Sequence, residues 1–102
     1  MGDVLELARK EILRREILML CRTACDTGCS RQVVQSVAAK MELGPGEADV
    51  DSALYYLQEK QLLRLEKTGN SRLGIQRDIY FITGAGMDYL DGTGPDIPGM
   101  GA

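Results

Sequence analysis

The chain has 102 residues, of which 44% are apolar and 26% are charged, and it carries a net charge of −3 at pH 7. This length fits one domain with a modest core, and the apolar fraction excludes a disordered chain. The acidic balance argues against strong non-specific affinity for nucleic acids. The chain contains no run of about 18 apolar residues, so no membrane helix is predicted. The opening residues MGDVLELARK do not have the pattern of a signal peptide.

Three cysteines, Cys21, Cys25 and Cys29, lie close together. An odd number does not form a closed disulfide framework, so we expect a reducing, cytoplasmic location. The three-residue gaps differ from the two-residue gaps of zinc ribbons, and the chain has no histidine to complete a site. We therefore expect no metal and no cofactor, and we interpret Cys21 and Cys25 as small buried apolar side chains.

A first helix is predicted from about residue 3 to residue 24. Apolar residues at helical spacing form one stripe that we expect to face the core. The stripe consists of Leu5, Ala8, Ile12, Leu13, Ile17, Leu20 and Cys21. A helix of this length spans roughly 30 Å, which is longer than a small domain needs. Its surplus N-terminal turn is either a solvated end or a contact with a second copy in a homodimer.

A second helix is predicted after a turn at Asp26–Gly28, with Ser30 as its N-cap. It is expected to end at Gly44–Pro45, because glycine suits the left-handed position after a helix and proline cannot continue one. Its inner face is predicted to consist of Val33, Val34, Val37, Ala38 and Met41.

The stretch from residue 50 to residue 83 predicts a helix that runs directly into a β-hairpin. The residues that share the inner face of this third helix and its end are Val50, Ala53, Leu54, Leu57 and Leu62. Leu63 and Leu65 then alternate with charged residues, which is typical of a half-buried strand. The glycine and asparagine of Thr68–Ser71 predict a turn there.

The second β-rich run, RDIYFIT, completes the hairpin. Residues 62–67 are expected to pair with residues 77–82, and Thr83 is expected to cap a short last helix. This order predicts an α+β, mostly α, winged helix-turn-helix: three helices, a β-hairpin wing and a short C-terminal helix. We assign residues 1–91 to this domain and residues 92–102, rich in glycine and proline, to a flexible tail.

The segment GEADVDSALYYLQEKQLLRLE, the hairpin ending in IT and the IPGM-type tail resemble a family of small winged-helix proteins of Mu-like phages and prophages, loosely described as ArsR-like regulators. The resemblance covers nearly the whole chain and rests on core positions such as Val50, Leu54 and Thr83, so it implies fold and phage origin more than mechanism. Residues 46–61 lack the cysteines of ArsR metal sensors. Family members commonly carry basic residues after the Pro-Gly, whereas Met-Gly-Ala follows Gly99 here.

The third helix of a DNA-binding winged helix enters the major groove. A step of about 100° per residue places Ser52 and Tyr55 on its outward face, where they are candidate DNA contacts. Residues 46–61 contain one base, Lys60, and four acids, whose repulsion of phosphates opposes binding. The acids are Glu47, Asp49, Asp51 and Glu59. Asp49 also suits the helix N-terminus electrostatically.

The hairpin carries the opposite charge. Its basic residues are candidate contacts to the DNA backbone or minor groove, together with Arg31 at the start of the second helix. The wing candidates are Arg64, Lys67, Arg72 and Arg77. The alternative is a solvated hairpin whose basic residues protect an edge strand from aggregation.

The sequence contains no catalytic constellation, since it has no histidine and no phosphate-loop spacing. We therefore expect a protein that is not an enzyme. Two hypotheses stay open: a DNA-binding regulator that binds double-stranded DNA, and a protein-interaction module that uses Tyr55 and Tyr56 against a protein partner.

Overall fold

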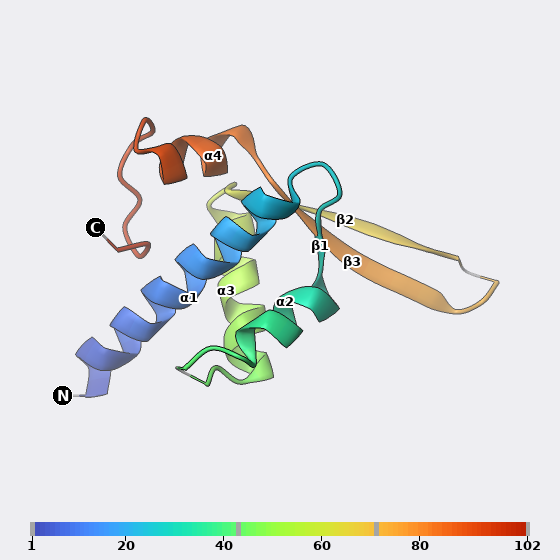
Figure 1. Cartoon of the computed structure of the whole chain (residues 1–102), viewed down its shortest axis with the longest axis horizontal. Coiled ribbons are helices and arrows are strands. Elements are labelled where there is room, and N and C mark those ends of the chain that lie inside the picture. Colours follow the sequence, from blue (N-terminus) through green and yellow to red (C-terminus); the bar gives the residue numbers. More distant parts are fainter. Residues whose placement is uncertain (1, 43, 71, 102) are drawn as a thin grey trace.

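The computed structural model describes residues 2–42, 44–70 and 72–101. Four helices and three strands follow one another along the chain (Figure 1). Their bounds are α1 Gly2–Ala24, β1 Cys29–Ser30, α2 Arg31–Ala38, α3 Glu47–Glu59, β2 Leu63–Asn70, β3 Ile75–Ile82 and α4 Gly84–Asp91. The strands form one antiparallel sheet in the order β1-β3-β2. This arrangement confirms the predicted α+β winged-helix architecture.

The wing is the β2–β3 hairpin, which projects well beyond the helices (Figure 1). Its register runs from Leu63 opposite Ile82 to Asn70 opposite Ile75, so the predicted pairing of residues 62–67 with 77–82 is confirmed. The predicted turn at residues 68–71 was placed too early, because β2 continues through Asn70; Ser71 lies outside the described residues. Gly69 permits this pairing, since a Cβ there would overlap the carbonyl oxygen of Ile75.

The core lies where α1, α3 and the base of the hairpin meet. The predicted inner residues of α3 and Leu62 are all buried, which confirms that face of the helix. No polar side chain among the described residues is buried. No described helix is both long enough and apolar enough to cross a membrane.

The apolar stripe predicted for α1 is correct only in its second half. Leu13, Ile17 and Cys21 are buried, and Leu18 joins them. Leu5 and Ile12, in contrast, are 63% and 45% exposed. The reason is that the core lies on the Leu13–Ile17–Cys21 side of α1, and residues seven apart, such as Leu5 and Ile12, fall on the opposite face.

The second helix begins as predicted, with the Ser30 side chain accepting a hydrogen bond from the Val33 amide at 3.2 Å. It ends at Ala38, however, well before the predicted stop at Gly44–Pro45. Val33 and Val37 are 46% and 42% exposed, so the predicted inner face was too wide. Only Val34 and Ala38 of α2 are buried.

The cysteine prediction was half right. Cys21 is fully buried as expected, but Cys25 is exposed, in a left-handed backbone position after α1 with φ of 22°. Cys29 takes the second buried position, because β1 carries it into the sheet opposite Tyr80.

Beyond the hairpin, the Thr83 hydroxyl caps α4 by accepting a hydrogen bond from the Gly86 amide at 3.0 Å, as predicted. The chain after α4, which composition suggested as a flexible tail, folds back in the structure: Met100 is completely buried and Ile97 packs against the core. The burial of the Met100 side chain explains why this segment folds back. The glycine and proline content of the segment does not indicate that burial.

Candidate nucleic-acid interface

The outer face of α3 is exposed and acidic. Tyr55, a predicted DNA contact, is 65% exposed, and Ser52 is exposed one turn earlier. The nearby carboxylate of Glu59 raises the pKa of Tyr55. Asp49 accepts a hydrogen bond from the Gly46 amide at 2.9 Å, so this carboxylate caps the helix as expected. Ser52 and Tyr55 are thus available to a ligand, in a negatively charged setting.

Arg31 is tied to that acidic helix. Its Nε and Nη2 atoms donate to the two carboxylate oxygens of Asp51, each at 2.8 Å, and Nη2 also donates to Glu47 at 2.7 Å. The hydrogen bond from Arg31 is the main cause that lowers the pKa of Asp51. The bidentate geometry fixes the start of α2 against the first half of α3. Arg31 therefore neutralises acids of α3, a role that the sequence did not predict because Glu47 and Asp51 are 16 and 20 residues away from it along the chain.

Three predicted DNA contacts line one hollow beside the middle of the wing. It has a volume of about 310 Å³ and is lined by Ser30, Arg31, Gln32, Lys67, Gln76, Arg77 and Asp78. Lys67 lies directly opposite Asp78 in the hairpin register. The hollow thus joins the N-terminal end of α2 to the two wing strands, and three basic residues and one acidic residue line it. Lys67 and Asp78 share one face of the hairpin, and the side chain of Arg77, the neighbour of Asp78, points to the other face.

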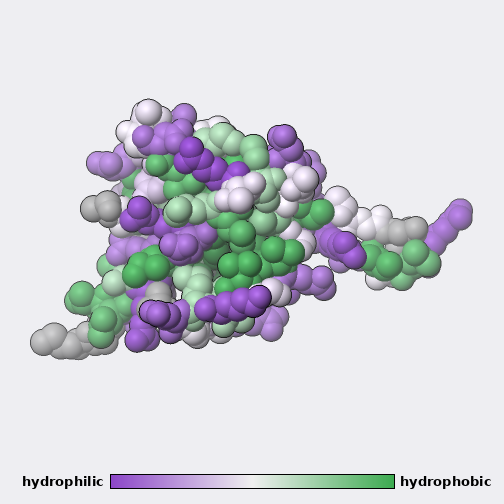
Figure 2. All heavy atoms as spheres, viewed as in Figure 1, coloured by the Kyte–Doolittle hydropathy of each residue, from purple (hydrophilic) through white to green (hydrophobic). Residues whose placement is uncertain are grey.

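The remaining wing candidates lie elsewhere. Arg64 forms an ion pair with Glu66, and its guanidinium lies 4.7 Å from the centroid of the Phe81 ring. Both contacts are within the hairpin. Arg72 is exposed near the wing tip. Sequence reasoning missed the apolar character of that tip: Leu73 and Ile75 are 68% and 47% exposed, and Figure 2 shows hydrophobic atoms at the far end of the wing.

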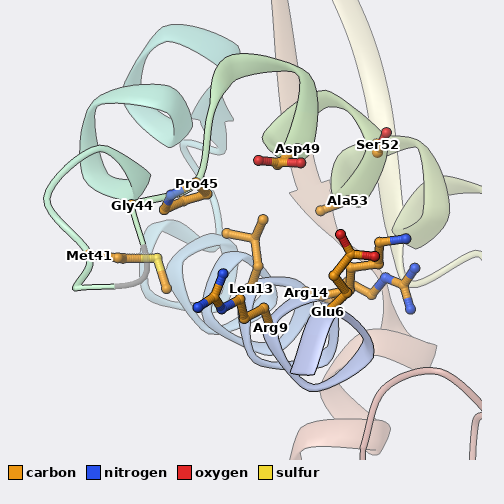
Figure 3. Close-up of a pocket in the computed structure, with 11 residues that line it drawn as sticks. Glu6, Arg9, Leu13, Arg14, Met41, Gly44, Pro45, Asp49, Ser52 and Ala53 are labelled. Atoms are coloured by element: carbon orange, nitrogen blue, oxygen red, sulfur yellow. The ribbon is translucent and has the colours of Figure 1, made fainter. Parts of the chain in front are cut away.

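A second hollow, of about 380 Å³, lies between the first half of α1 and the start of α3 (Figure 3). Arg9 and Arg14 of α1 line it together with Asp49 and Ser52 of α3. Both charge signs are present, and Ser52 of α3 is among the residues that line the hollow. Among residues 2–42, 44–70 and 72–101, no three His, Cys, Asp or Glu side chains are grouped so that they could hold a metal ion.

Tyr56, proposed from the sequence as a protein contact alongside Tyr55, makes its contacts within the molecule. The Arg14 guanidinium stacks on its ring at 3.7 Å from the centroid, and its hydroxyl donates a hydrogen bond to the carbonyl of Pro98. Of the two neighbouring tyrosines, only Tyr55 points into solvent.

Comparison with known proteins shows a similarity of fold to a solved structure. No family model matches the sequence, and neither does any curated protein. A crystal structure of a PadR-like transcription factor from Bacteroides fragilis is similar in fold, with a TM-score of 0.72 at 22% sequence identity. The match covers 88% of this chain and 84% of that one. The chain therefore has the winged-helix fold of a PadR-like transcription factor.

Proposed function

We propose that this protein is a winged-helix DNA-binding regulator of transcription that contacts double-stranded DNA through its wing and its third helix, without enzymatic activity. The observation that carries the proposal is that Arg31, Lys67 and Arg77 all line one hollow beside the N-terminal end of α2. Such an arrangement suits a backbone phosphate, which cations and helix N-termini both attract. The fold similarity to a transcription factor supports the same conclusion.

The proposed division of labour follows the charges. The wing supplies the electrostatic attraction through Lys67, Arg77 and Arg72. Helix α3 presents Ser52 and Tyr55 to base edges, where a hydroxyl can donate or accept a hydrogen bond. Arg31 contributes indirectly as well, because it neutralises Asp51 and Glu47, which would otherwise repel the DNA backbone.

The wing tip suits the minor groove. Leu73 and Ile75 are exposed beside Arg72, and apolar side chains flanked by a cation are the means by which several proteins widen or kink that groove. The contact fixes the position of the protein along the duplex and adds little sequence information.

We further propose a homodimer through α1. Leu5, Ile12 and Met19 lie seven residues apart on the face opposite the core and are 63%, 45% and 49% exposed. Arg9 and Glu16 flank this stripe, also seven residues apart. An antiparallel second copy of α1 would bring Arg9 of each copy beside Glu16 of the other, so the surface is self-complementary in shape and charge.

The sequence resemblance to winged-helix proteins of Mu-like phages supports a phage-type regulator, and the unpaired cysteines suit a reducing cytoplasm. The competing proposal is a protein-interaction module without DNA binding. The exposure of Tyr55 on an acidic helix face favours it, because tyrosine is enriched at protein interfaces and the acids disfavour DNA.

The test is a duplex-binding titration of the double variant K67A/R77A at several salt concentrations. We expect affinity to fall similarly for all sequences, and the log-log salt slope to shrink by about one to two units, as two phosphate contacts are lost. The matched control is Arg22→Ala, which removes a cation from an ion pair between α1 and α4 and should change little. Equal losses in control and double variant, or no duplex binding by the wild type at about 50 mM salt, would favour the interaction module.

A further inference from the structure

The segment of residues 97–101, which we call the strap, is held by side chains from three helices. Arg14 of α1 donates from Nη1 to the carbonyl of Gly99 at 2.6 Å, and Tyr56 of α3 donates to the carbonyl of Pro98. Tyr89 of α4 lies within hydrogen-bond distance of the carbonyls of Met100 and Gly101, at 3.3 Å and 3.4 Å. Each contact joins a side chain of the helical body to the backbone of the strap.

The anchor of the strap is Met100. Its side chain has no exposed surface and belongs to the core cluster, together with Ile97 at the cluster's margin. A tight turn brings the two residues together, with the Met100 amide donating to the Ile97 carbonyl at 3.3 Å. The strap thus combines one buried apolar side chain with backbone carbonyls that accept hydrogen bonds from side chains of the helices, as peptide ligands do in their binding sites.

The site also selects for glycine between proline and methionine. Gly99 has φ of +90°, and a Cβ there would overlap the Tyr56 hydroxyl and lie 3.1 Å from Arg14 Nη1. Any larger residue would be both strained and in collision. The side chains that surround the strap therefore favour glycine at position 99 and an apolar residue at position 100.

We propose that α1, α3 and α4 form a peptide-binding site, that the strap is its resident ligand, and that the site accepts an Ile-Pro-Gly-Met peptide in trans when the strap is displaced. The donors and the ring that form this site belong to α1, α3 and α4, which residues of the core cluster other than Met100 also hold together. The proposal requires that the site persists when the strap is displaced. The tether of residues 92–96 has no regular secondary structure, and it keeps the strap at a high effective concentration.

The site adjoins the outer face of α3. Arg14 and Tyr56 line a shallow depression together with Ser52, Tyr55 and Glu59. Displacement of the strap uncovers a guanidinium stacked on an aromatic ring at the edge of that face. A partner that carries an apolar-Pro-Gly-Met segment would thus compete with the strap directly beside the proposed contact surface. This binding site goes beyond the proposed DNA contacts and does not depend on them.

The experiment uses a fluorescein-labelled peptide of sequence DIPGMG and the full-length variant M100D, whose charged side chain cannot occupy the core pocket. We expect the peptide to bind M100D and to bind the wild type at least about tenfold more weakly, because the tethered strap competes there. The control peptide DIPGDG should not bind either protein. Adding Tyr56→Phe to M100D removes one donor and should weaken binding of the peptide severalfold, without loss of helical circular dichroism.

A folded M100D that fails to bind the peptide, or a wild type that binds it equally well, would overturn the proposal. Gly99→Val, which expels the strap by collision with Tyr56, provides a second variant with the same expected result. If both variants fail to fold, the strap is an inseparable part of the core, and the proposal is wrong.

Discussion

The third helix and the wing are joined end to end, yet they carry opposite charges and differ in how those charges are used. The acids of α3 are largely engaged within the molecule: Asp51 and Glu47 hold Arg31, and Asp49 caps its own helix. In the middle of the wing, Lys67 and Arg77 line an open hollow. If the proposed function holds, the electrostatic attraction for a duplex comes from the wing and not from α3, which then provides shape and hydrogen bonds.

The largest expected effect distinguishes the two faces of α3. Leu54→Ala removes a side chain that is 1% exposed and should lower the free energy of unfolding by about 2–5 kcal/mol. Tyr55→Ala, on the adjacent outward position, is the matched control and should leave the urea midpoint nearly unchanged. Comparable losses in the two variants would mean that the outer face of α3 is itself packed against something.

The next largest effect is expected from a substitution that disrupts the wing and leaves the helices folded. Gly69→Val places a side chain against the backbone of β3, so the outer half of the hairpin cannot keep its register. We expect amide protection to be lost beyond Lys67 in hydrogen exchange, while α1 and α3 stay protected. Loss of protection throughout the chain would show that the wing and the helical body fold as one unit.

Much of the fold could be predicted from local patterns. The inner face of α3 and the strand alternation from Leu63 follow from periodicity alone, and Ser30 and Thr83 cap their helices as their side chains suggest. The strap could not be predicted, because one methionine among glycines and prolines has no periodicity. The missed half of the α1 stripe has another cause: Leu5 and Ile12 are apolar at helical spacing, and the sequence cannot say which of two apolar faces meets the core.

The candidate site was predictable in composition and not in geometry. Basic residues in the wing are visible in the sequence, and Lys67 and Arg77 both line the hollow. The engagement of Arg31 with Asp51 and Glu47 depends on the packing of α2 against α3, which no local pattern encodes. The same packing distinguishes Tyr55 from Tyr56, whose ring is covered by Arg14.

The buried thiol of Cys21 predicts how the free energy of unfolding depends on pH. Burial is the largest cause that raises the pKa of the Cys21 thiol, from 9.0 to about 12. The unfolded chain therefore loses this proton at lower pH than the folded chain. The contribution of the Cys21 thiol to the free energy of unfolding is complete below pH 9.0, and it is lost as the pH rises from there to about 12. The urea midpoint should fall across this window, and less steeply in Cys21→Ala.

A smaller effect tests the link between α2 and the acids of α3. Arg31→Met removes one cation from the hollow and also exposes the charges of Asp51 and Glu47. It should weaken duplex binding more than Arg22→Met, which removes one cation from a distant ion pair. Titration of both variants at one low salt concentration makes the comparison. Equal binding by the two variants would show that Arg31 does not shield α3.

The most direct measurement compares single charge changes on the two regions, with duplex affinity determined at about 50 mM salt. Lys67→Ala in the wing should weaken binding, and Glu59→Gln on the outer face of α3 should strengthen it, because one attractive and one repulsive charge are removed. Both positions are exposed, so folding should be unaffected. If Glu59→Gln weakens binding, or if Lys67→Ala leaves it unchanged, the wing is not the source of the attraction and the account of the two regions is contradicted.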